Sequence, residues 1–121
     1  MPLSYWCVLI AALLPYAAAI IAKSKQGFDN AAPRDWLAKQ EGFRARADAA
    51  QLNSFEAFPL FAIAVLVAQQ RSAPQDTVNM LAVIFVVARV AYIALYVANL
   101  ATLRSLVWLV GLGCAVAMFF V

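Results

Sequence analysis

Four long apolar runs alternate with three polar segments along this chain. The runs cover residues 3–22, 55–68, 78–98 and 106–121. A helix rises about 1.5 Å per residue, so about twenty residues span the roughly 30 Å core of a bilayer. The second run follows an alanine-rich stretch that is expected to be helical from near Gly42 and to enter the membrane near Asn53. The pattern predicts an all-α integral membrane protein with four transmembrane helices.

The polar segments are expected to connect these helices. The first, residues 23–45, is long and contains residues typical of turns, namely Gly27, Asp29-Asn30 and Pro33. The other two cover residues 69–77 and 99–104. Pro59 lies inside the second run, where a neighbouring helix can satisfy the carbonyl that proline leaves without a donor.

Basic residues are concentrated on one side of the predicted membrane. Six lysines and arginines lie between residues 23 and 46, and Arg104 lies in the third connection, whereas the second connection has only Arg71. Positive residues favour the cytoplasmic side, so we expect the basic loop 23–45 in the cytoplasm and both termini outside. A cleaved signal peptide is the alternative for the first run, but no lysine or arginine precedes it.

Composition agrees with a small membrane domain. Of the 121 residues, 66% are hydrophobic and 12% are charged, against about 45–50% and about 25% in soluble domains. We interpret residues 1–121 as a single domain, and the net charge of +3 is too small to indicate nucleic-acid binding. Cys7 and Cys114 lie in apolar runs and are expected to be buried free thiols. Without histidine, a transition-metal site is not expected.

Two charged residues lie within predicted spans, where a charge costs at least about 2.5–3.5 kcal/mol at mid-bilayer. Glu56 is just inside the second span, and Arg89 is near the middle of the third. At about 100° per residue, polar residues cluster on one face of each helix, within arcs of roughly 80° and 60°. These residues are Arg46, Asn53 and Glu56 on one helix, and Arg89, Tyr92 and Tyr96 on the other.

We expect the two polar faces to meet and form a pocket. Arg46 and Arg104 would lie at its cytoplasmic rim. Guanidinium groups, a carboxylate and phenol hydroxyls suit a ligand that carries carboxylates and an amine.

These residues also have simpler interpretations. Glu56 and Arg89 could form an interhelical ion pair that fixes packing. The tyrosines could belong to the aromatic belt of a membrane protein, and the arginines could contact lipid headgroups. Gln51 points to another face of its helix and could reach a site shared with a neighbouring subunit.

Residues 46–61, RADAAQLNSFEAFPLF, resemble the second-helix motif of the MAPEG superfamily, the membrane-associated proteins of eicosanoid and glutathione metabolism. The resemblance extends to RVAYIALY at residues 89–96 and to Arg104-Ser105. DNAAPR at residues 29–34 is similar to the loop motif of the bacterial branch. The resemblance covers essentially the whole chain in length and in the order of the spans. Within the superfamily, the chain is most similar in type to the bacterial members that resemble microsomal glutathione transferases.

This resemblance implies a left-handed four-helix bundle that assembles as a homotrimer and holds glutathione, as a co-substrate, between adjacent subunits. It implies a set of glutathione-binding residues: Arg46, Gln51, Asn53, Glu56, Arg89, Tyr92 and Tyr96. It also implies that Arg104 stabilises the thiolate, with Ser105 as a second candidate. Ala57 departs from the family pattern, because a tyrosine often follows the glutamate.

Three functions are considered. The first is a membrane-embedded glutathione-dependent transferase or peroxidase that acts on lipophilic electrophiles. The second is a non-catalytic MAPEG-fold protein that binds a lipid or a partner. The third is a small proton-coupled multidrug exporter. Such exporters typically carry a glutamate near mid-membrane in the first helix, whereas Glu56 lies at the edge of the second span.

Overall fold

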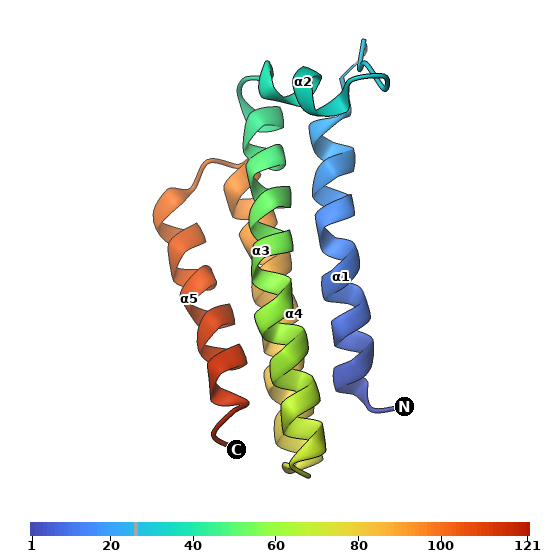
Figure 1. The fold of residues 1–121 in the computed structure, drawn as a ribbon. Coiled ribbons are helices and arrows are strands. Elements are labelled where there is room, and N and C mark those ends of the chain that lie inside the picture. Colours follow the sequence, from blue (N-terminus) through green and yellow to red (C-terminus); the bar gives the residue numbers. More distant parts are fainter. Residues whose placement is uncertain (26) are drawn as a thin grey trace.

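The computed structural model describes residues 1–25 and 27–121, and it contains five helices (Figure 1). The helices are α1 (Leu3–Ala22), α2 (Pro33–Ala38), α3 (Phe43–Gln70), α4 (Gln75–Val97) and α5 (Ala101–Ala117). No strand occurs in the two described stretches, and the all-α prediction is confirmed. Gln26, part of the predicted long loop, lies outside the described residues.

The helices are those of an integral membrane protein. Three of them, α1, α3 and α4, are long and apolar enough to cross a membrane, and α5 is a shorter apolar helix. α3 has 28 residues. At about 1.5 Å per residue it is about 42 Å long and exceeds the roughly 30 Å bilayer core. α3 therefore has more residues than are needed to cross the core.

The last helix begins earlier than the sequence pattern indicated. α5 covers Ala101–Ala117, and its connection to α4 is confined to residues 98–100. Asn99 adopts a positive φ of 63° in this connection, a conformation in which asparagine is enriched. Arg104 therefore lies in the first turn of α5, where its N–H donates to the carbonyl of Leu100 at 3.0 Å. The backbone of Arg104 is thus held by a helix and not by a loop.

A short helix, α2, interrupts the predicted loop. Pro33 occupies its first position and Asp35 lies in its first turn, and both residue types favour the start of a helix. Its six residues are too few for hydrophobic periodicity to reveal a helix. α2 lies across one end of the bundle, and both chain termini lie at the other end (Figure 1).

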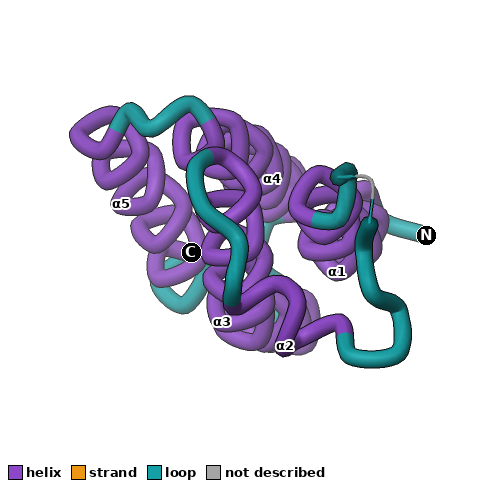
Figure 2. The backbone as a smooth tube through the Cα atoms, turned by 90° about the horizontal axis from the view of Figure 1, so that it is seen from above, coloured by secondary structure: helices purple, strands orange, loops and turns teal. Residues whose placement is uncertain are grey.

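α3 and α4 form the central pair of the bundle. α1 packs against both of them, whereas α5 packs mainly against α4. Seen along the bundle, α1 and α5 lie on opposite sides of this pair (Figure 2). The side of α3 that faces α5 is therefore covered less completely than the side that faces α1.

The largest core cluster contains two stacked phenylalanines. Phe61 on α3 and Phe85 on α4 lie with ring centroids 3.9 Å apart and ring planes 5° apart. Gly111 on α5 lies so close that a Cβ atom there would be 3.6 Å from the Phe85 ring. Small residues allow membrane helices to approach closely. Cys7 and Cys114 are buried in the same cluster as free thiols, as the sequence indicated.

Candidate functional site

Arg89 is a buried charge at the contact between α3 and α4, with only 3% of its surface exposed. Its Nη2 donates to Asn53 Oδ1 at 2.9 Å and to Ser54 Oγ at 3.3 Å. The Ser54 hydroxyl donates to the carbonyl of Ala50 at 2.8 Å, which leaves its lone pairs for Arg89. Neutral oxygens therefore hold this guanidinium, and no carboxylate neutralises it within the described part of the chain.

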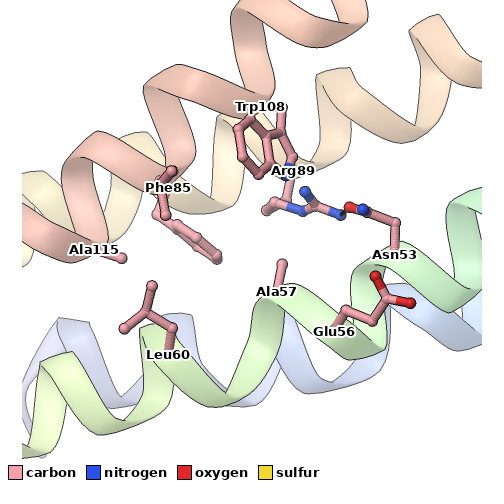
Figure 3. A pocket seen from close by; sticks show the side chains of 9 residues that line it. Asn53, Glu56, Ala57, Leu60, Phe85, Arg89, Trp108 and Ala115 are labelled. Atoms are coloured by element: carbon pink, nitrogen blue, oxygen red, sulfur yellow. Dashed lines mark hydrogen bonds between the residues drawn. The ribbon is translucent and has the colours of Figure 1, made fainter.

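Glu56 does not form the ion pair with Arg89 that the sequence left open, as far as the described residues go. Figure 3 shows the guanidinium directed at the Asn53 amide, with the Glu56 carboxylate apart from it. The Glu56 side chain is exposed. Because an uncompensated carboxylate in a membrane span is costly, this group is suited to receive a cation from a ligand or a neighbouring subunit.

Aromatic rings lead from Arg89 toward the α2 end of the bundle. The Arg89 Cζ lies 4.2 Å from the centroid of the Tyr92 ring. Tyr92 packs edge to face on Tyr96, with centroids 5.6 Å apart. The Arg104 Cζ lies 4.3 Å from the Tyr96 centroid. We call these four side chains the cation–tyrosine ladder. Each cation–π contact contributes about 0.5–2 kcal/mol, so the ladder helps to hold the start of α5 against α4.

The ladder forms part of the wall of a pocket of about 250 Å³, which we call the polar pocket. Its lining residues are Asn53, Tyr92, Tyr96, Arg104, Ser105 and Trp108. Arg104 is half-buried and Ser105 is exposed. The polar pocket thus brings an amide, two phenols, a guanidinium and a hydroxyl within reach of one ligand, and five of these residues were predicted from the sequence.

A second pocket, of about 180 Å³, lies closer to the termini, and we call it the lipid-side pocket (Figure 3). It is lined from α3, α4 and α5 by Asn53, Glu56, Ala57, Leu60, Phe85, Arg89, Trp108, Leu112 and Ala115. Asn53, Glu56 and Arg89 make one end polar, and the other end is apolar. Asn53 and Trp108 line both pockets, so the two pockets share a wall.

Arg46 and Gln51 lie outside these two pockets. Arg46 Nε donates to the carbonyl of Val97 at 3.0 Å and ties the start of α3 to the last residue of α4. Gln51 lines a third pocket, of about 550 Å³, between α2, α3 and the end of α1. The charged residues in that lining are Lys23, Arg34 and Asp48. The polar face predicted on the second span is therefore divided, because only Asn53 and Glu56 reach the lipid-side pocket.

Besides the aliphatic residues and Phe85 of the lipid-side pocket, Ser54 and Trp108 were not identified from the sequence. Ser54 is an ordinary residue for a membrane helix, where serine often occupies helix contacts, so nothing distinguished it. Trp108 lies four residues after Arg104, and residues at this spacing share one face of a helix. That signal was available, but Arg104 was assigned to a connection and the shared face was not apparent.

The sequence model of the MAPEG family matches residues 3–121 of this chain. The match includes every helix and all residues of the polar and lipid-side pockets. No curated protein and no solved structure matches the chain.

Proposed function

Because the chain belongs to the MAPEG family, we propose that it is a glutathione-dependent transferase or peroxidase acting on lipophilic electrophiles. The polar pocket supports this proposal most strongly, because Arg104 lines it and Arg89, which lines the adjoining lipid-side pocket, contacts Tyr92 in its wall. Glutathione carries two carboxylates, one ammonium group and a thiol. Arg89 attracts a carboxylate, Glu56 attracts the ammonium group, and the tyrosine hydroxyls donate hydrogen bonds.

Arg104 has the role of stabilising the thiolate in this proposal. A free thiol has a pKa of about 8.5, and the thiolate is the nucleophile. A guanidinium about 4 Å from the sulfur contributes roughly 4 kcal/mol at an effective dielectric constant near 20, before desolvation is subtracted. Arg104 lies in the first turn of α5, whose N-terminal end also favours an anion. Ser105 lines the same pocket and would donate its hydroxyl to the same sulfur.

In the proposed reaction, glutathione in the polar pocket reacts with an electrophile in the lipid-side pocket. The sulfur forms a bond to an electrophilic carbon, the leaving group departs with the electrons of the broken bond, and the thiol proton passes to water. With a hydroperoxide, the sulfur takes the terminal oxygen, the O–O bond breaks and an alcohol leaves. A second glutathione then forms glutathione disulfide and releases that oxygen as water.

We also propose a homotrimer, in which the third pocket with Gln51 faces the site of a neighbouring subunit. Gln51 and the basic residues of that pocket would then contact the same glutathione from the other side. Native mass spectrometry of the protein released from detergent is expected to give a trimer. A spectrum with only monomers and dimers contradicts this assembly.

The direction of insertion can be tested with two matched cysteine substitutions. Ser24 and Ser72 are exposed at opposite ends of the bundle, and Cys7 and Cys114 are buried. We expect a membrane-impermeant maleimide to label Ser72→Cys in intact cells and to label Ser24→Cys only after lysis, because loops rich in lysine and arginine favour the cytoplasmic side. The parent protein controls for the native thiols. The opposite labelling pattern would show that the protein has the reverse orientation in the membrane.

The proposed function predicts that glutathione stabilises the protein. At a concentration of about 100 times Kd, a ligand that binds only the folded state adds about 2.7 kcal/mol to the free energy of unfolding. The measurement is a melting curve of the detergent-purified protein titrated with glutathione, with S-methylglutathione as the comparison. The absence of any shift at millimolar glutathione argues against the proposal. If glutathione raises the melting temperature but the protein does not turn over an aryl halide, the protein binds glutathione without catalysing its transfer.

A further inference from the structure

A small cavity lies between α1, α3 and α4, on the inside of the bundle. Its polar lining side chains are those of Arg89 and Ser54, and its wall on α1 includes Ala11. We propose that this cavity binds a single water molecule, which is held by Arg89, Ser54 and the backbone carbonyl of Ala11. This water would tie α1 to the Arg89 guanidinium. The inference goes beyond the proposed function and does not depend on glutathione binding.

The size of the cavity suits one water molecule. Its volume is about 10 Å³. A cavity needs about 10–15 Å³ to hold a water, and a buried water usually makes about three hydrogen bonds. Ala11 and Ser54 are each 4% exposed and Arg89 is 3% exposed, so the cavity is an internal site and not a groove in the lipid-facing surface.

Arg89 has unused hydrogen-bond donors for this water. A guanidinium group carries five N–H donors. Both side-chain hydrogen bonds that Arg89 makes among the described residues come from Nη2, which leaves three N–H groups on Nε and Nη1. One of these can donate to the water while two remain for a carboxylate of a ligand. The water therefore does not compete with Asn53, with Ser54 or with glutathione.

Pro15 makes an acceptor available on α1. This proline lies inside the helix and is buried. Because proline has no N–H, the carbonyl four residues earlier, that of Ala11, lacks its helical donor. In membrane helices, ordered waters are among the groups that satisfy such a carbonyl. Since Ala11 lines the cavity, a water bound there can donate to its carbonyl oxygen.

Ser54 can accept the second hydrogen of the water. Its hydroxyl donates to the carbonyl of Ala50 and accepts from Arg89. A hydroxyl oxygen has two lone pairs, so Ser54 can accept one further hydrogen bond. The water would then donate to Ser54 and Ala11 and accept from Arg89. With these three bonds, one molecule connects α1, α3 and α4.

A structure that resolves internal waters tests the site directly. We expect a density peak about 2.5–3.2 Å from the Ala11 carbonyl oxygen, Ser54 Oγ and a nitrogen of Arg89. In Pro15→Ala, a backbone N–H returns to the Ala11 carbonyl, so the peak should weaken or move away from it. Pro59→Ala removes the intrahelical proline of α3, which does not line the cavity, and should leave the peak unchanged. A map of the parent protein that shows other buried waters but no peak here overturns the inference.

Two substitutions of similar size at Ala11 give a second readout, the melting temperature in detergent without glutathione. Ala11→Ser adds a hydroxyl to the wall of the cavity and can replace the bonds of the water. Ala11→Cys adds a thiol, which behaves as a small apolar group and leaves the polar groups of the cavity unsatisfied. We therefore expect Ala11→Ser to melt at a higher temperature than Ala11→Cys. The reverse order is expected of a dry cavity and overturns the inference.

The same pair of substitutions at Ala12 is the matched control. Ala12 is the next residue of α1 and does not line the cavity. The cysteine variant should be the more stable there, because a hydroxyl is costlier than a thiol in an apolar environment. Should Pro15→Ala fail to fold, the map of the parent protein and the pair at Ala11 still decide. Because glutathione is absent from these measurements, their outcome is separate from that of the transferase proposal.

Discussion

Replacing Arg104 with alanine is expected to lower kcat for glutathione transfer at neutral pH by about 10²–10³-fold, the loss typical of removing one donor to a developing anion. The guanidinium acts on the charged sulfur more than on the rest of the ligand. Glutathione affinity should therefore stay close to that of the parent, because Arg89, Asn53 and Glu56 remain. The measurements are steady-state kinetics with an aryl halide and an ultraviolet titration of the bound thiolate, which should move to higher pH.

Two further variants control this experiment. Arg104→Lys keeps a positive charge near Tyr96 but lacks the planar fork, so it should recover only part of the rate. Arg71→Ala removes an exposed arginine whose Nη1 donates to the carbonyl of Phe119 at 2.9 Å, at the opposite end of the bundle, and it should leave the kinetics unchanged. Full activity of Arg104→Ala with an unmoved thiolate titration would transfer the role to Ser105.

Replacing Arg89 with leucine is expected to abolish stabilisation by glutathione and to lower the stability of the ligand-free protein. Asn53 and Ser54 lose their shared donor, and an unsatisfied buried polar group costs about 1–3 kcal/mol. The cation–tyrosine ladder also loses its first member. The measurement is a pair of melting curves, with and without glutathione.

Arg71→Leu is the control for this change, because it removes an arginine that donates a side-chain hydrogen bond but is remote from both pockets. Its melting curve should still shift with glutathione. If Arg89→Leu is as stable as the parent and responds equally to glutathione, then Arg89 is dispensable for both folding and binding.

The sequence was sufficient for the spans because a bilayer imposes a strong length requirement on apolar runs. The first span was predicted with the bounds that α1 has, Leu3–Ala22. The start of α5 was misplaced because Arg104 was interpreted as part of a connection. A charged residue near a membrane surface is compatible with either a loop or a helix, and only the backbone turn at Asn99 decides between them.

The site was predicted less completely, because the angle at which a residue projects from one helix does not show which residue of another helix it contacts. The spacing placed Arg89, Tyr92 and Tyr96 together, and all three belong to the ladder. It did not reveal that Arg46 bonds to the end of α4, since that contact depends on how far α3 extends past its neighbour. Whether these residues bind glutathione stays a prediction that the experiments above test.

The hydrogen bond between Arg89 and Asn53 also has a consequence for biosynthesis. Each residue lies within a span, and neither can leave its polar group unsatisfied in hydrocarbon without a cost of several kcal/mol. Residues 71–74 alone separate α3 from α4, so the two helices can enter the bilayer together as a hairpin. We therefore expect the insertion machinery to hold α3 until α4 has been synthesised, and a ribosome stalled before Arg89 should leave α3 in a state that alkali extracts from the membrane.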